Sequence, residues 1–469
     1  MGIMSRVLGP VWSAGREGFG GRWKRTGRAP GTALGTALGR GPGTTPGRAR
    51  APGLLLAFAA ALLPVLGACE SLSDLGPAGG DEPVPVDELP RELSEEEVEV
   101  VRGSADFGLQ LLERLAERAP EETHFVSPFS ASMALGMTLM GAGGTTFNAM
   151  ASTLGLSGLS EEEIGQAYRA LLELLEELDP AVSLQVANAV WHGAEFTADP
   201  DFRARVEEEF GGTVEGLDFS DEEEAARRIN DWVADATEGR IEELVTLPLP
   251  PGLVAYLTNA VHFQAGWTEP FDPEETREAP FHLPDGSTVP VRLMARTGEM
   301  PVAVEPSYKA VELPYGGGAF SMTVVVPREG EELRDVLSDL AGGGWSHLVD
   351  SLEEGRARVY LPRFQVEWDG VLNEALEDLG MGEAFTPAAD FGRMLQGANP
   401  WIDEVKQKTF LRVDEEGTEA AGATSVAMIQ SMPPTVRADR PFLLALRERH
   451  SGTLLFAGVV VEAPEDPED

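Results

Sequence analysis

Between residues 97 and 463 the hydrophobic pattern changes from a helical period to a strand period, and no clear linker interrupts it. Apolar residues with helical spacing begin near Glu95. A second helix is predicted over 130–140, and after a Gly-rich break a third ends at residue 154. Further helices are predicted over 160–178, 200–210 and 222–245. Strands are predicted over 182–193, 254–267, 279–295, 309–327, 357–369 and 441–464, with one helix inserted over 371–381. This order predicts one large α+β domain in which early helices pack on later strands.

The stretch Val413–Pro434, VDEEGTEAAGATSVAMIQSMPP, is ambiguous between loop and strand. Alternate residues from Thr418 to Met428 are uncharged, and Glu419, the only charge after Gly417 in this stretch, has the opposite parity. Because side chains alternate between the faces of a strand, the segment could present an uncharged face to a core. Alanine and glycine are poor strand formers, so composition alone also fits a flexible surface connection. We predict a loop that can become a strand.

The charge of the chain excludes one class of partner. The formal net charge is −42, and it is unevenly distributed along the sequence. Residues 1–68 contain nine Lys and Arg and one acid, whereas the remainder contains 27 basic and 77 acidic residues. Such a body is repelled by nucleic acids and by anionic membrane surfaces, so no nucleic-acid partner is expected.

The only cysteine, Cys69, follows a short apolar run at residues 53–68. This run is broken by Pro64 and is too short for a membrane span, but with basic residues before it the run suits an export signal. The ending Leu66-Gly67-Ala68-Cys69 resembles the bacterial lipobox, in which cleavage before the cysteine leaves a lipidated N-terminus; a plain secretory signal is the alternative. We therefore expect residues 1–68 to be an extension and signal peptide. The mature protein is expected at the bacterial cell envelope, anchored only through lipid on Cys69, or otherwise secreted.

Acidic segments flank the predicted domain. Residues 69–96 are rich in Pro and Gly and poor in aromatic residues, which predicts a disordered tether extended by self-repulsion. The folded domain is expected over 97–463, followed by an acidic tail at 464–469. A single cysteine allows no intrachain disulfide.

Reactive side chains are sparse for an enzyme. The six histidines form no HExxH motif and no pair with metal-ligand spacing, and cysteine ligation is excluded. The sequence contains no G-x-S-x-G elbow, no Walker loop and no dinucleotide fingerprint. A catalytic Ser/His/Asp set assembled from distant segments remains a third hypothesis. We predict a protein that is not an enzyme and needs no cofactor or metal.

Five segments, in the same order, resemble the serpin family over about residues 97–463. They are FVSPFSASMALGMTLMGA (125–142), TNAVHFQAGWTEPF (258–271), VDEEGTEAAGATS (413–425), VRADRPFLLAL (436–446) and LLFAGVVVEAP (454–464). The resemblance implies an α+β fold with helices on large mixed and antiparallel sheets and an exposed reactive loop. It also implies a suicide-substrate inhibitor of serine, and sometimes cysteine, proteases. The cleaved loop inserts into the main sheet, carries the acyl-enzyme with it and distorts the protease.

The resemblance assigns a hinge to the start of the reactive loop. Its residues are Glu415, Gly417, Thr418, Glu419, Ala420, Ala421, Gly422 and Ala423. Glycine gives backbone freedom, and small uncharged side chains on the inserting face do not hinder entry into a sheet. This composition favours inhibition over a non-inhibitory binding or chaperone role, which remains the second hypothesis.

Two further groups of residues follow from the resemblance. Trp267 is expected at the breach, the end of the main sheet where the loop enters, and Arg363 is expected to pair there with Glu415. The shutter beneath the opening sheet is expected to contain Ser127, Ser130, Asn259 and Gln407. Gln407 occupies a position where histidine is usual, so the hydrogen bonds can survive while a pH response is expected to be lost.

The position of the reactive bond is left with two alternatives. Spacing from Glu415 places it at Ser431–Met432, whereas alignment from Pro441 places it at Gln430–Ser431, and Pro433 argues against a cut after Met432. The absence of Arg and Lys there favours an elastase-, subtilisin- or chymotrypsin-like protease over a trypsin-like one, with Met428 as a secondary site. The resemblance places the helix at 161–178 where serpins activated by heparin carry a basic helix. This helix is acidic, so no glycosaminoglycan is expected to bind. A monomer is expected.

Overall fold

The computed structural model describes residues 83–467 except 238, 240, 242, 250, 251 and 419–432. Its α-helices are α1 (Glu95–Arg118), α2 (Pro128–Leu139), α3 (Gly144–Thr153), α4 (Glu161–Glu177), α5 (Pro200–Glu209), α6 (Glu222–Ala236), α7 (Leu333–Asp339), α8 (Trp345–Ser351) and α9 (Asn373–Leu376). None of the described helices is long and apolar enough to cross a membrane.

The strands within the described residues form three sheets. The first sheet contains β1 (His124–Val126), β6 (Arg277–His282), β7 (Thr288–Val304), β8 (Tyr308–Tyr315), β9 (Phe320–Pro327), β10 (Glu353–Pro362), β15 (Thr435–Arg437), β16 (Phe442–Glu448) and β17 (Leu454–Val460). The second contains β2 (Val182–Gly193), β4 (Thr213–Leu217), β5 (Ala255–Gly266), β11 (Phe364–Val371), β13 (Val405–Val413) and β14 (Gly417–Thr418). A small third sheet pairs β3 (Thr197–Ala198) with β12 (Leu395–Gln396).

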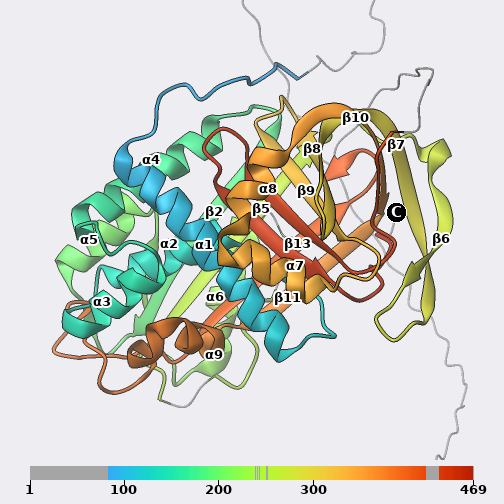
Figure 1. Ribbon diagram of the computed structural model, residues 1–469. Helices are drawn as coiled ribbons and strands as arrows, with labels where there is room; N and C mark the ends of the chain where they lie inside the picture. The colour runs from blue at the N-terminus through green and yellow to red at the C-terminus, as the bar shows by residue number, and fades with distance from the viewer. Residues whose placement is uncertain are drawn as a thin grey trace, which may run out of the picture. The chain divides into compact units, whose positions relative to one another are not determined.

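The second sheet is the six-stranded sheet, and its main path runs β11-β13-β5-β2-β4. The pairs β13–β5 and β2–β4 are parallel, whereas β11–β13 and β2–β5 are antiparallel. Figure 1 shows α1 to α5 gathered on one side of the molecule and β6, β7 and β10 on the other. The predicted α+β architecture, with early helices and large mixed sheets, is confirmed.

Local sequence signals explain where several helices begin. Ser94 and Ser160 cap α1 and α4, and each side chain accepts a hydrogen bond from the backbone of the glutamate three residues later, which returns a bond to the cap. Acidic residues in both first turns complement the helix dipole. In α2, Pro128 takes the first helical position after Ser127, where a missing N–H is harmless. Every residue of α2 is buried, and its small side chains let it lie close beneath β5.

Two helix predictions need correction, and two short helices were missed. The helix expected over 222–245 ends at Ala236, because Gly239 with φ +79° leaves the helical conformation and the Thr237 hydroxyl accepts the amide of Ile241. The helix expected over 371–381 is shortened to α9, and Gly380 with φ +113° interrupts the following turns. The short helices α7 and α8 were not predicted, because the glycines between them break the helical period.

The folded domain also begins earlier than the predicted boundary at residue 97. The backbone N–H of Val86 donates to Gly317 O at 2.9 Å, and Val86 and Leu93 pack against the core. Arg91 forms an ion pair of 2.5 Å with Glu97, which is 3% exposed. Part of the segment predicted to be the tether is therefore attached to the domain, because its few apolar side chains pack against the hydrophobic core.

Candidate functional site

The six-stranded sheet is the candidate functional site, because two residues of the predicted hinge already belong to it. They form β14, in which Gly417 lies opposite Gly266 and Thr418 opposite Ala265, antiparallel to β5. The other edge of β5 is occupied by β2, where Val182 lies opposite Ala265. The predicted reactive loop therefore starts as a strand on the edge of β5 that faces β13.

β14 pairs with one end of this edge of β5, and β13 pairs with the opposite end. The parallel pairing between β5 and β13 covers Leu257–Asn259 opposite Val405–Gln407. By contrast, β13 pairs with β11 along its length, from Lys406 to Val413. In the described part of the sheet, β5 and β13 are thus closed at one end and admit β14 at the other, which is the geometry of a sheet that can accept a new strand.

Gly417 is required by the close approach at the entrance. Its φ is +141°, a region that L side chains rarely adopt, and a Cβ there would lie 2.6 Å from Ala265 O, Gly266 Cα and Trp267 N. Any other residue would push β14 away from β5. The sequence predicted backbone freedom at this position, and the structure adds a steric reason for glycine.

Trp267, the residue predicted for the breach, lies where the backbone before Gly417 meets the end of β5. Its indole N–H donates to Asp414 O at 3.0 Å, and its backbone N–H donates to Glu416 O at 2.9 Å. The ring stacks on Tyr315, with centroids 4.2 Å apart, and meets Phe271 edge-on. These contacts fix the backbone that precedes Gly417 against the end of β5.

The expected pair of Arg363 and Glu415 is present at the same entrance. Arg363 Nε lies 3.4 Å from Glu415 Oε2, and both side chains are less than 10% exposed. The Thr276 hydroxyl donates to the other oxygen of Glu415 at 2.6 Å. Arg363 Nε is also 3.3 Å from Asp466, in the segment predicted to be an acidic tail. The sequence did not indicate Thr276 or Asp466, since both lie far from Glu415 along the chain.

The four predicted shutter residues form one buried network under the closed end of the sheet. Gln407 Oε1 accepts the Ser127 N–H at 2.9 Å, and Gln407 Nε2 donates to Asn259 Oδ1 at 3.1 Å. Asn259 Nδ2 in turn donates to the Ser130 hydroxyl. The Ser127 hydroxyl donates to Leu455 O at 2.7 Å. The network therefore ties α2 to both β5 and β13, across the line along which these strands would separate.

A fifth member of the network was missed. Asn188 Oδ1 accepts from Asn259 Nδ2 at 2.7 Å, and Asn188 is 1% exposed on β2. The available signal was an amide on the strand face that also carries Val182, Leu184, Val186 and Val190, since a buried amide needs hydrogen-bond partners.

Other predicted site residues lie outside the described part of the chain. They are the hinge residues Glu419, Ala420, Ala421, Gly422 and Ala423, the reactive-bond candidates Gln430, Ser431 and Met432, the secondary site Met428, and the lipidation site Cys69.

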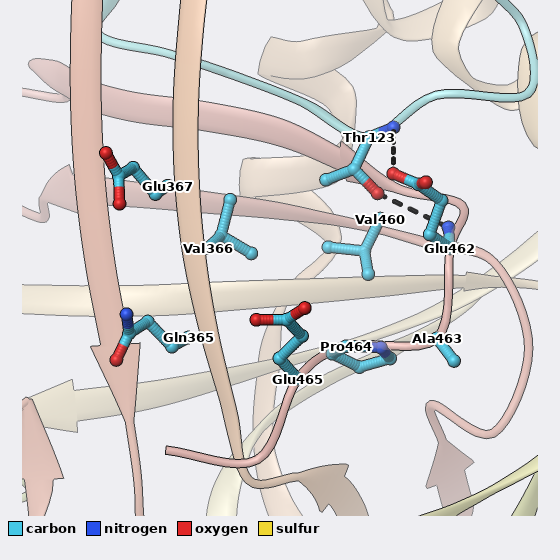
Figure 2. Close-up of a pocket in the computed structure, with 9 residues that line it drawn as sticks. All are labelled: Thr123, Gln365, Val366, Glu367, Val460, Glu462, Ala463, Pro464 and Glu465. Carbon is cyan, nitrogen blue, oxygen red and sulfur yellow. Dashed lines mark hydrogen bonds between the residues drawn. The ribbon is translucent and has the colours of Figure 1, made fainter. Parts of the chain in front are cut away.

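A separate hollow of about 290 Å³ lies between β11 and the end of the described chain. Figure 2 shows Glu367 on the β11 side and Glu462 and Glu465 on the other side, with Glu462 bonded to Thr123. None of the predicted site residues lines it. Among the described residues no group of His, Cys, Asp or Glu could hold a metal ion, and nothing in this hollow indicates a catalytic centre.

Comparison with known proteins gives consistent matches. Residues 102–463 match the family model described as serpin (serine protease inhibitor). A serpin-like protein of Thermococcus kodakarensis is 35% identical over 380 residues, which cover 79% of this chain and 87% of that protein. The leukocyte elastase inhibitor of Sus scrofa is 32% identical over 366 residues, or 75% of this chain and 96% of that protein. The crystal structure of human thyroxine-binding globulin with thyroxine has a TM-score of 0.73 and 27% identity, and the match covers 79% of this chain and 100% of that one.

Proposed function

This chain belongs to the serpin family, and we propose that it is a suicide-substrate inhibitor of serine proteases, with cysteine proteases as a second possible target class. A protease attacks the reactive loop near Ser431 and forms an acyl-enzyme with the residue before the cut. The freed loop then extends β14 into the six-stranded sheet and carries the protease with it. At about 3.3 Å per strand residue, the acyl group travels on the order of 40–50 Å.

The register of β14 is the observation that best supports this proposal. Extending the antiparallel register brings Ala420 opposite Phe263 and Gly422 opposite Val261. Phe263, Val261 and Ala265 belong to the main hydrophobic core, so the residues opposite them face that core on insertion. Glu419 takes the opposite face, as strand alternation requires. The alternate loop residues that carry no charge are thus the ones that would come opposite the core-facing residues of β5.

The same register divides insertion into two stages. Thr424 comes opposite Asn259, the residue that pairs with Gln407 of β13. Residues up to Ala423 enter the sheet before they reach this pair. From Thr424 onward, the hydrogen bond between Asn259 and Gln407 must break. We infer that the shutter network sets the resistance to the second stage.

Incubation with a panel of serine proteases tests the proposed function. The lack of Arg and Lys near Ser431, and the name of the porcine relative, favour elastase-, subtilisin- or chymotrypsin-like proteases as targets. We expect a covalent complex that survives boiling in denaturing gel electrophoresis, as a trapped acyl-enzyme requires. Cleavage of the loop by every protease, without complex, would contradict the proposal.

A non-inhibitory binding protein is the alternative. The thyroxine-binding globulin structure, of similar fold, was determined with a bound small molecule. The hinge composition supports inhibition instead, because the residues from Thr418 to Ala423 are small and uncharged except for Glu419, which falls on the opposite face of the extended register. Loop cleavage with neither complex formation nor a gain in thermal stability would favour the alternative.

We also propose that the protein is exported and held at a bacterial cell envelope by lipid on Cys69. The proposal is supported by the apolar run at 53–68 and by the position of the only cysteine directly after Leu66-Gly67-Ala68. Metabolic labelling with a fatty-acid analogue should mark the wild-type protein and not Cys69→Ala. Equal labelling of both would refute the anchor.

A further inference from the structure

Arginine and tyrosine side chains gather on one face of the first sheet, beside the end of the reactive loop. Arg356, Arg358 and Tyr360 alternate with the buried residues of β10, so all three lie on its half-exposed face. Tyr360 is paired with Arg437 of the edge strand β15. The guanidinium carbons of Arg358 and Arg437 lie 4.9 Å and 4.5 Å from the centroid of the Tyr360 ring. We call these four residues the Arg–Tyr patch.

The acids around the patch leave the exposed guanidinium of Arg358 without a close acidic partner. Arg437 Nε pairs with Asp439 at 2.5 Å, but the nearest acid to Arg358, Glu275, is 3.9 Å away, beyond hydrogen-bond distance. The Arg358 side chain is 42% exposed, so its guanidinium is accessible from solvent. Within the described residues, the Nε atoms of Arg356 and Arg358 have no hydrogen-bond partner, but both atoms are buried and do not contribute to the docking surface. Glu299 lies opposite Arg356 across the strands and is exposed. Stacking on Tyr360 holds a guanidinium flat and leaves its remaining N–H groups for an incoming carboxylate.

The Arg–Tyr patch lies close enough to the reactive bond for a bound protease to contact it. The backbone N–H of Arg358 donates to Pro434 O at 2.8 Å, so the end of the loop is attached directly to β10. From Ser431 to Thr435 the chain spans at most about 14 Å. A protease–inhibitor interface covers about 800 Å² on each partner, which corresponds to a disc of about 16 Å radius. A protease bound at the reactive bond therefore reaches the patch.

We propose that the Arg–Tyr patch is a second docking surface for the target protease, and that it recognises an acidic surface beside the protease's active-site cleft. This inference rests on the proposed function and adds a determinant of specificity to it. Arginine and tyrosine dominate binding energy at protein interfaces. In a body with 77 acidic residues after position 68, local guanidinium groups select an acidic partner surface at this one place and orient it over the loop.

The test compares one protease in two charge states. Subtilisin is used with its surface lysines free or succinylated, which replaces positive by negative charges while the catalytic triad stays the same. The association rate constant for inhibition is measured for wild type and for Arg356→Ser/Arg358→Ser. We expect the double substitution to slow capture of succinylated subtilisin about tenfold at low ionic strength. The rate with unmodified subtilisin should change by less than about twofold, and 1 M NaCl should abolish the difference.

A matched control carries the same change of net charge away from the patch. Arg169→Ser/Arg334→Ser removes two exposed arginines, on α4 and α7, and should leave both rates unchanged. Unfolding temperatures of all variants are compared, and Arg358→Gln alone, with a smaller but selective loss, serves if the double variant is unstable. Equal slowing with both forms of subtilisin, or equal slowing by the control, overturns the docking surface. Failure of the wild type to form a gel-stable complex with any protease of the panel overturns the proposed function itself, whereas failure with subtilisin alone moves the same comparison to a panel protease that is trapped.

Discussion

At the scale of single residues, Gln407 has the clearest consequence. Its amide accepts from the Ser127 N–H and donates to Asn259, a combination that does not depend on pH because glutamine has no titratable proton. A neutral histidine at this position could also accept and donate. A protonated histidine can only donate, so it would face the Ser127 N–H with another donor.

We therefore predict that Gln407→His makes the native form sensitive to acid. The folded state needs the neutral ring, so its pKa is held below the unfolded value of about 6.5. Stability is then retained above about pH 6.5 and falls as the pH decreases below it, by about 1–3 kcal/mol. The measurement is the difference in unfolding temperature between variant and wild type from pH 8 to pH 5. A difference that does not vary with pH would contradict the assigned hydrogen bonds.

Composition identifies the shutter residues only in part. Ser127 and the helix start after it follow from local sequence, because serine before proline is a strong helix-start signal. The roles of Asn259 and Gln407 came from resemblance to a family, since nothing local says that two amides from distant strands meet. Asn188 escaped both routes, because its partner lies 71 positions along the chain and only the strand pairing brings them together.

At the scale of elements, β14 decides how the loop works. On extension, residues with the parity of Thr418 come opposite Ala265, Phe263 and Val261 of the main core. Glu419 comes opposite Gln264, which is half-buried, because alternate side chains take opposite faces. The insertion mechanism therefore distinguishes neighbouring positions that composition alone treats alike.

This parity yields a paired prediction. Thr418→Arg places a charge on the inserting face, and burying an unpaired charge is costly enough to slow insertion strongly. The variant should be cleaved as a substrate, with the moles of inhibitor used per mole of protease inhibited raised about tenfold or more. Glu419→Arg, the matched control on the outer face, should keep the wild-type stoichiometry. The measurement is a titration of protease activity, and similar behaviour of the two variants would refute the register.

The elements that sequence could not predict share one physical cause. Long periodic segments, such as α1 and β5, were predicted correctly because their apolar pattern is sustained. Glycines with positive φ lie just after the shortened helix α6 and inside the interrupted segment after α9; glycine permits this conformation but does not require it, so the sequence does not say which glycine adopts it. The two-residue strand β14 has no local signal, since only the opening between β5 and β13 makes it a strand.

At the scale of the whole molecule, the segment before α1 is part of the domain. Arg91 donates two hydrogen bonds to Glu97, at 2.5 and 2.7 Å, and the Ser94 N–H donates a third. Burial acts to raise the pKa of Glu97, but the hydrogen bonds and the positive charge of Arg91 outweigh it and hold the pKa below its usual value. These hydrogen bonds hold the segment before α1 against the first turn of that helix.

Arg91→Gln should reveal this contact through its pH dependence. A depressed pKa stabilises the fold above the unfolded value of about 4.5, and this stabilisation is lost as the pH falls through the folded value. Because Arg91 is 41% exposed, solvent screening limits its contribution to about 1 kcal/mol near pH 7. Chemical denaturation at pH 7 and at pH 3.5 should show the difference from wild type shrinking in acid. A constant difference would mean that Arg91 acts by packing alone.

The central claim is that the cleaved loop becomes a strand between β5 and β13, and the unfolding temperature before and after cleavage tests it most directly. A metalloprotease is used to cut the loop, because its mechanism forms no acyl-enzyme and leaves the cleaved chain free. About ten new backbone hydrogen bonds, each contributing about 1 kcal/mol, should raise the unfolding temperature of a domain of this size by about 10 °C or more. An unchanged or lower unfolding temperature after cleavage would contradict insertion.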